Sequence, residues 1–304
     1  DIPADFRLGS QNEIDLLEED VAVQTIEQNY EDNDGSFSDL VELVSSGRDD
    51  KGLQDTLHRL YGFVRSHPFY RGWLDEKLLM YDDTIPVGQT VWGQVILQYA
   101  LDAVEFARSQ LRRAIEQMQG DAAMEKAYLP AFASDLAQLN ALYSTLRTGS
   151  WGEVCRQLQT IRPERLGSLR GYEDDGKKQL VQRMRKSAQA VVAKLAEQLF
   201  CADEQEFAED IRFLRPRIET LFSLVLDYDH RLLAAKRERS LLDFADLEHF
   251  AVQLLVERRD GEYCKTPLAR QLSESFAFVL VDEYQDTNAT QDMIFDSVSR
   301  PDNL

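Results

Sequence analysis

Apolar residues recur three or four positions apart along most of this chain, with polar residues between them. This period places apolar side chains on one face of an α-helix, so it predicts a mainly helical protein. Helices are predicted around residues 14–26, 37–44 and 53–64, over 91–119, 122–146 and 151–158, from about 177 to 199, and over 207–239. The helix at 53–64 is expected to end before Pro68, because the residue preceding a proline resists the helical conformation.

A helix start signal lies close to the beginning of the chain. Residues 6–8 are expected to be extended, and Ser10 and Glu13 follow with the spacing of a capping box. In such a box each side chain binds the backbone amide of the other residue. We therefore expect this pair to begin the first helix.

The C-terminal part of the chain has a different pattern. A helix is expected after Asp243, with its buried side formed by Leu247, Phe250, Ala251, Leu254 and Leu255. The apolar run at 276–281 predicts a strand buried on both faces, and residues 290–298 predict another helix. We expect this strand to pair with the N-terminal extended segment, to pack on helices, or to be poorly ordered, since unpaired strands are hazardous. The succession indicates an α/β unit joined to a helical body.

The segment from Phe278 to Thr287, FVLVDEYQDT, carries the clearest chemical signal. Two adjacent acids, Asp282 and Glu283, follow the predicted strand, and α/β sheets bind ligands at this edge. This is the arrangement of a Walker B site, in which the first carboxylate holds Mg²⁺ and the second activates the attacking water. The alternative is an ordinary strand followed by an acidic turn.

A second phosphate-binding pattern is incomplete. Residues 171–178 match a P-loop at seven positions, but Lys178 stands where a Ser or Thr must bind Mg²⁺. Three consecutive acids fill the loop, and no apolar strand precedes it. We reject this segment as a nucleotide site, so no cofactor-binding residue is assigned.

Composition limits the class of protein. The chain has 304 residues, of which 43% are hydrophobic, which is typical of a globular protein with two domains or one large insertion. No apolar stretch approaches the length of a membrane span, and no signal peptide opens the chain. The three cysteines are far apart and match no metal spacing, which predicts reduced thiols in a cytoplasmic protein.

Charge is distributed unevenly. The formal net charge is −20, and residues 1–55 contain 16 acidic against 3 basic side chains. Residues 156–194 reverse this ratio, with 10 basic against 4 acidic. The asymmetry indicates either a cationic face on an acidic body or a solvated helix surface. On the helix that begins near Lys177, Arg183, Arg185 and Lys186 are expected to lie off the buried face formed by Leu180, Met184, Ala188, Val191, Leu195 and Leu199.

Several strings resemble one protein family. LLDFADLE at 241–248, followed by VLVDEYQDTN at 279–288, resembles superfamily 1 helicases of the UvrD/Rep/PcrA type. LYGFVRSHPFYRGWLDE at 60–76, together with the Tyr284 form of the second motif, is similar to the A subunits of the AddAB (RexAB) helicase–nucleases. FRLGSQNE at 6–13 is similar to the stretch that follows this family's early helicase motifs.

The resemblance implies the domain organisation. Residues 1–12 and 239–304 would form a partial RecA-like α/β motor domain, and residues 13–238 a large helical insertion similar to subdomain 1B. The fold expected is therefore mainly α. The insertion contacts DNA in the family, which implies DNA-binding roles for Lys177, Lys178, Arg183, Arg185 and Lys186.

The resemblance also implies roles in the acidic motif. Asp282 would bind Mg²⁺, Glu283 would be the general base for ATP hydrolysis, Gln285 would sense the γ-phosphate, and Asp286 would couple the nucleotide and DNA sites. The parent protein would use ATP and Mg²⁺ as a helicase and exonuclease in double-strand break processing and recombinational repair. Its implied partners are DNA, the remaining motor and nuclease domains of the same polypeptide, and the B subunit, with no membrane.

The family's P-loop, the arginine of its second motor domain and its nuclease domain are missing from this sequence, so we interpret it as a piece of a larger protein. We expect no ATPase, helicase or nuclease activity and no bound cofactor from this piece alone, because major electrostatic contributions to phosphoryl transfer are lost. One alternative is a non-enzymatic acidic helical interaction module. Another is a metal-dependent hydrolase using Asp282, Glu283 and Asp286, although no His or Cys ligand lies nearby.

Overall fold

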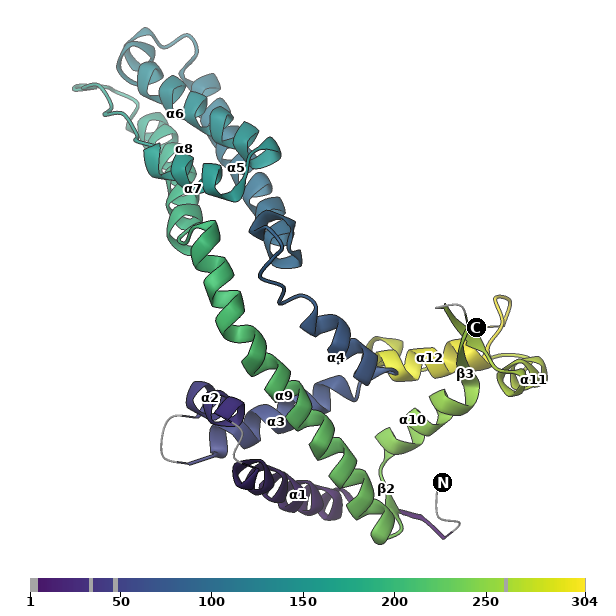
Figure 1. Cartoon of the computed structure of the whole chain (residues 1–304). Helices are drawn as coiled ribbons and strands as arrows, with labels where there is room; N and C mark the ends of the chain where they lie inside the picture. Colours follow the sequence, from purple (N-terminus) through teal and green to yellow (C-terminus); the bar gives the residue numbers. More distant parts are fainter. Residues whose placement is uncertain (1–4, 33–34, 46–48, 260–261, 304) are drawn as a thin grey trace. The chain divides into compact units, whose positions relative to one another are not determined.

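The computed structural model describes residues 5–32, 35–45, 49–259 and 262–303 (Figure 1). Residues 1–4 of the predicted N-terminal motor segment thus lie outside the described residues. The chain divides into two compact units, here called the terminal unit (Asp1–Tyr81 and Leu214–Leu304) and the central unit (Asp82–Phe213). These divisions differ from the boundaries inferred from the resemblance, and the assignment of residues 13–238 to a 1B-like insertion stays a prediction.

The terminal unit consists mainly of helices around one apolar core. Leu53 and Leu57 share this core with Leu17, Leu224 and Leu232, and all five are almost fully buried. The helices are α1 (Gln11–Glu31), α2 (Gly35–Val44), α3 (Lys51–Val64), α4 (Tyr70–Leu78), the later part of α9 (Glu204–Glu238), α10 (Phe244–Leu255), α11 (Pro267–Ser275) and α12 (Ala289–Val298). The apolar period predicted most of them correctly, but neither α4 nor α11 was predicted as a separate helix.

Two short strand pairs lie in the described part of the terminal unit. β1 (Arg7–Leu8) runs parallel to β2 (Leu241–Leu242), with Arg7 opposite Leu241. β3 (Val256–Arg259) and β4 (Glu262–Lys265) form an antiparallel pair. The predicted extended segment at 6–8 is confirmed as β1, but neither its partner nor the β3–β4 pair was predicted.

The prediction of a buried strand at 276–281 is wrong. The segment is not a strand, and the side chains of Phe278 and Leu280 are 77% and 92% exposed. β1 pairs with β2 instead of with this segment. The physical reason is that an apolar run shows a tendency toward burial but does not specify what covers it. No strand in the described part of the chain offers it a ladder of backbone partners.

Two local predictions also need correction. Ser10 is the N-cap of α1, but its side chain makes no capping hydrogen bond. The Glu13 carboxylate instead accepts two bonds from the Arg7 guanidinium, at 2.8 and 2.5 Å, because an ion pair outcompetes a neutral cap. On α10 the buried residues are Asp246, His249, Val252 and Leu255, whereas Leu254 is 61% exposed.

The central unit is a set of packed helices with its own core. Leu111 and Met118 are buried in this core with Phe132, Leu142 and Trp151. The helical segments are η1 (Val87–Gln89), α5 (Val91–Met118), α6 (Ala122–Thr148), α7 (Trp151–Thr160), α8 (Asp175–Lys194), η2 (Leu195–Leu199) and the first turns of α9. The predicted helices are confirmed here to within a few residues.

The expectation that Arg185 lies off the buried face of α8 is wrong. Its side chain is buried and donates to the Asp135 carboxylate at 2.7 and 3.1 Å and to the Glu164 carbonyl at 2.7 Å. Arg185 shares its face with Val181 and Ala188. A charge is tolerated there because Asp135 of α6 pairs with it.

None of the described helices combines the length and the low charge content that crossing a bilayer requires.

Candidate functional site

The acidic motif forms an exposed turn before α12. Residues 282–286 are all exposed, and Tyr284–Asp286 form a single 3₁₀ turn, η3. The extended residues before the turn are held by the C-terminal residues, since the Val279 amide donates to the Asn303 carbonyl at 2.7 Å. After the turn, Asn288 caps α12 by accepting from the Gln291 amide at 2.8 Å.

Glu283 has a left-handed backbone conformation, with φ 51° and ψ 42°. This conformation is costly for a residue with a β-carbon, and such strain clusters at functional positions. The Asp282 carboxylate accepts from the Glu283 amide at 3.0 Å, and the Gln285 side-chain amide donates to the Glu283 carboxylate. The turn therefore brings together three of the residues that the sequence motif singled out.

The donor chemistry of this turn fits Mg²⁺. Asp282 and Glu283 present carboxylate oxygens to solvent, and Mg²⁺ is commonly held by one or two carboxylates together with phosphate oxygens and water. The described residues contain no cluster of three or more His, Cys, Asp and Glu side chains able to hold a metal.

Tyr284 is tied to α12. Its hydroxyl donates to the Asp292 carboxylate at 2.5 Å. This hydrogen bond to a carboxylate raises the pKa of Tyr284, so the phenol stays protonated. The contact spans the turn and restrains residues 285 and 286 between its two ends.

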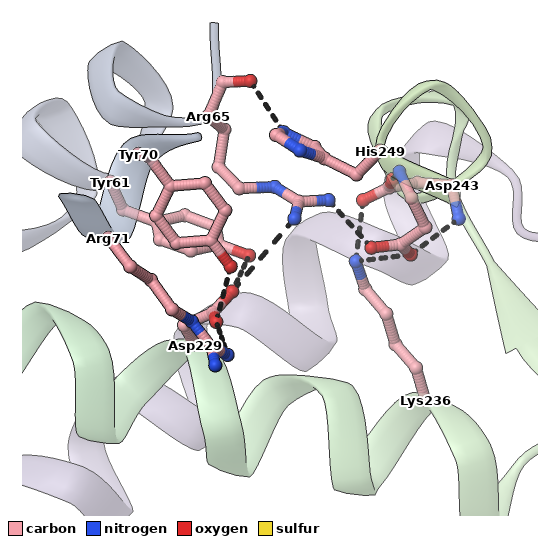
Figure 2. Close-up of polar contacts among 9 residues, drawn as sticks. Tyr61, Arg65, Tyr70, Arg71, Asp229, Lys236, Asp243 and His249 are labelled. Atoms are coloured by element: carbon pink, nitrogen blue, oxygen red, sulfur yellow. Dashed lines mark hydrogen bonds and ion pairs between the residues drawn. The ribbon is translucent and has the colours of Figure 1, made fainter. Parts of the chain in front are cut away.

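A buried network of charged side chains lies at the start of α10 (Figure 2). Asp243 and Asp246 form a reciprocal capping box, in which each carboxylate accepts the other residue's amide at 2.7 and 3.1 Å. The Lys236 ammonium, fully buried on α9, donates to Asp243 at 2.5 Å and to Asp246 at 2.9 Å. The second oxygen of Asp246 accepts from Arg65 at 2.7 Å. Both aspartates of the LLDFADLE string are thus committed to ion pairs with Lys236.

The network continues to Asp229 of α9, whose side chain is fully buried (Figure 2). Its carboxylate accepts hydrogen bonds from the Tyr61 hydroxyl at 3.3 Å, the Tyr70 hydroxyl at 2.7 Å and Arg71 at 3.2 Å. The Arg65 guanidinium lies 4.0 Å from the carboxylate oxygen that accepts from Tyr61. Arg65 therefore joins the two halves, and three cations balance three carboxylates.

Burial and charge shift several pKa values within the network. Burial opposes ionisation of Asp243, but Lys236 outweighs it and lowers the pKa of Asp243. Burial, followed by the nearby Arg65 charge, lowers the pKa of His249, whose Nε2 lies 2.9 Å from the Arg65 carbonyl oxygen. Burial raises the pKa of Tyr61 well above its usual value. Neutral His249 and protonated Tyr61 are thus favoured at neutral pH.

Two hydrogen bonds connect the helices of the network with the helix that follows the acidic turn. The Gln291 side chain of α12 donates to Glu248 of α10 at 2.8 Å, and the Thr290 amide donates to the Ser66 carbonyl at 3.1 Å. The start of α12 is therefore held against α10 and the end of α3. This arrangement gives the acidic turn a fixed support.

The five predicted DNA-binding residues of α8 fall into three groups. Arg183 and Lys186 are exposed, and Arg185 is buried as described above. Lys177 is partly buried and pairs with Asp121 at 3.2 Å, and Lys178 lies 4.0 Å from Asp175. The last residues of the rejected P-loop segment, 175–178, form the start of α8. The Asp174 side chain is the N-cap of this helix and accepts a hydrogen bond from the Lys177 amide.

The buried network was missed in the sequence, although a signal for it exists. On α9, Asp229 and Lys236 occur at the same helical spacing as the buried Val225 and Leu232. A charged residue within an apolar stripe predicts a buried ion pair, because an unpaired buried charge is very unfavourable. The partners Arg65 and Asp246 lie in the two strings, 60–76 and 241–248, that carried the family resemblance. The resemblance assigned no role to either residue.

The fold and the acidic turn together define a class of protein. Residues 54–303 match the family model of the UvrD/REP helicase N-terminal domain, and the chain belongs to that family.

Among curated proteins, the chain is similar to the A subunit of the ATP-dependent helicase/nuclease from Bacillus mycoides, with 35% identity over 99% of this chain and 24% of that protein. The protein of the same name from Acetivibrio thermocellus is 30% identical, over 98% of this chain and 24% of its own length. The protein of the same name from Ruminiclostridium cellulolyticum is 28% identical, over 99% of this chain and 25% of its own length. The chain thus spans about a quarter of the length of these relatives.

Proposed function

We propose that this chain provides the Walker B carboxylates and a DNA-contacting surface of an ATP-dependent DNA helicase–nuclease. The observation that carries the proposal is the exposed turn at Asp282 and Glu283, with its strained Glu283 backbone. The similarity to proteins named for an ATP-dependent helicase/nuclease supports the same conclusion. The process served would be double-strand break processing and recombinational repair.

Each residue of the turn has a distinct task in this proposal. Bound Mg²⁺ would supply charge neutralisation on the phosphates of ATP. Asp282 would hold the cation through its carboxylate. Glu283 orients a water molecule and accepts its proton, while Gln285 holds the Glu283 carboxylate through its side-chain amide and senses the γ-phosphate. Asp286 would help to couple ATP hydrolysis to DNA binding.

The DNA-contacting surface is proposed on α8 of the central unit. Arg183 and Lys186 are three positions apart and exposed, so they present two cations on neighbouring parts of one helix. Lys177 and Lys178 lie one to two turns earlier, in ion pairs that phosphate groups are able to replace. Phosphate contacts of this kind give affinity without sequence preference. Arg185 is excluded because it is buried with Asp135.

The isolated chain is proposed to be inactive as an ATPase, helicase or nuclease. Its partners in the parent protein would be DNA, the remaining motor and nuclease domains of the polypeptide, and a B subunit. A non-enzymatic acidic module explains the acidic excess of residues 1–55 but gives no role to the turn at Glu283.

The test is Glu283→Gln in the full-length protein. The expected result is a loss of ATPase kcat by roughly 10²–10⁴-fold, with ATP binding retained, because the variant removes only the proton acceptor. Glu274→Gln, at an exposed position on α11, is the matched control and keeps its activity. ATPase activity of the Glu283→Gln variant equal to wild type would refute the assignment.

A further inference from the structure

The terminal unit contains a cleft separate from the acidic turn. Its volume is about 480 Å³, and all of its lining residues belong to this one unit. The walls come from the α3–α4 connection, α4, α9, α10 and the β3–β4 pair. Three arginines and two aromatic residues are among the lining side chains: Arg71, Arg237, Arg258, Phe69 and Tyr263. None of residues 282–286 lines it.

The exposed charges of this cleft are all positive. Arg71, Arg237 and Arg258 are exposed, and the carboxylate among the lining residues, Asp246, is buried and bound to Arg65 and Lys236. Within the described part of the chain, the guanidinium groups of Arg237 and Arg258 donate no hydrogen bond. In a chain of net charge −20, such a cleft is a local attractor for an anion.

A pair of stacked aromatic rings forms part of the wall. The rings of Phe69 and Tyr263 are parallel to within 2°, with centroids 4.1 Å apart. Tyr263 is 47% exposed, and the Arg258 guanidinium lies over its ring at 5.8 Å from the centroid. A π-rich surface beside guanidinium groups suits a ligand that joins a planar ring to an anionic group.

We propose that this cleft holds one nucleotide unit of single-stranded nucleic acid, with the base against Phe69 and Tyr263 and the phosphate at Arg237 and Arg258. A nucleotide satisfies both features of the cleft. An acidic peptide would engage the arginines and leave the ring pair unused, and a duplex keeps the faces of its bases stacked. The inference rests on the proposed function in its choice of nucleic acid, but its residues differ from those of α8.

The experiment is fluorescence anisotropy of the 304-residue chain with a short labelled oligothymidylate across a salt series. Arg237→Ala and Arg258→Ala are each expected to weaken binding several-fold and to lower the salt slope by about 0.7. Tyr263→Leu is expected to weaken binding about tenfold, and Tyr263→Phe to retain it, because the ring supplies the stacking. Circular dichroism melting of each variant separates lost binding from lost folding.

Neighbouring arginines supply matched controls. Arg239 and Arg259 are exposed, each within two positions of a cleft arginine, and neither lines the cleft. Arg239→Ala and Arg259→Ala are expected to bind like wild type. Equal losses in these controls, wild-type binding by a folded Tyr263→Leu variant, or no binding by the wild-type chain at low salt would each overturn the inference.

A parallel variant separates this inference from the proposed surface on α8. If Arg183→Ala/Lys186→Ala loses binding while the cleft variants keep it, the α8 surface stands and the cleft inference fails. The reverse result supports the cleft alone. Competition by thymidine 5′-monophosphate identifies the source of the ligand: displacement that depends on Arg258 indicates a free nucleotide, and its absence indicates that the strand is required.

Discussion

Arg65 donates to Asp246 at 2.7 Å across 181 positions of sequence, and both side chains are nearly inaccessible to solvent. The contact joins the end of α3 to the first turn of α10. Because Arg65 also approaches Asp229, one guanidinium organises both halves of the buried network. The two strings that carried the family resemblance, LYGFVRSHPFYRGWLDE and LLDFADLE, therefore meet at this pair.

Arg65→Ala is expected to destabilise the chain by about 3–5 kcal/mol, because it leaves the Asp246 carboxylate buried with one fewer partner. Urea unfolding monitored by circular dichroism measures this change. Arg71→Ala is the control, since its side chain is 65% exposed although it also binds Asp229. A loss at Arg71 equal to that at Arg65 would contradict the central role of Arg65.

The stability of the chain is expected to rise with pH through the titration of His249. Its pKa is lowered in the folded state, so the unfolded chain binds the proton more tightly. The folded state is consequently destabilised as pH falls below the unfolded value of about 6.5 and toward the lower folded value. Unfolding free energies measured from neutral to mildly acidic pH should show a smaller slope for His249→Gln. His230→Gln, at an exposed position on α9, is the control substitution.

Glu283→Gly is expected to stabilise the isolated chain relative to Glu283→Ala by about 1 kcal/mol. Glycine adopts the left-handed conformation without the steric cost that alanine retains. Thermal or urea unfolding of the two variants gives the difference directly. Equal stability would show that the backbone at this position carries no strain.

Substitutions of Arg185 and Arg183 are expected to have contrasting effects, the first on folding stability and the second on DNA binding. Arg185→Met leaves Asp135 buried without its cation and should cost about 3 kcal/mol or more of stability. Arg183→Met removes an exposed charge and should change stability by less than about 0.5 kcal/mol, while weakening DNA binding and its salt dependence. Weaker DNA binding by a stably folded Arg185→Met variant, with Arg183→Met unaffected, would contradict the proposed surface.

Local periodicity was sufficient to predict most of the helices, because the spacing of residues such as Leu53, Leu57 and Val64 already specifies a face. Periodicity did not predict which segments or side chains pair with one another. The run at 276–281 has the composition of a buried strand, yet burial depends on neighbouring strands that local sequence does not specify. Arg185 was misplaced for a similar reason, since its burial depends on Asp135, fifty positions away.

The acidic turn was predicted from its residues, whereas its support was not. The order of Asp282, Glu283 and Gln285 singled out these residues, and the structure brings the three together in one turn, while their chemical roles stay a prediction. The bond from Gln291 to Glu248 links two helices whose contact no local pattern indicates. Attention to charged residues inside apolar stripes would have recovered part of the network, beginning with Asp229 and Lys236.

The pairing of β1 with β2 has a consequence for the order of events during synthesis. Arg7 cannot pair with Leu241 until the chain has been synthesised past residue 241, whereas the central unit is one continuous stretch that ends earlier, Asp82–Phe213. Contacts between distant parts of a chain form slowly, and domains generally fold as units while the ribosome is still translating. On stalled ribosomes, the central unit should therefore become resistant to protease at a shorter chain length than the terminal unit. The early helices of the terminal unit cannot complete their packing until α9 and α10 have been synthesised.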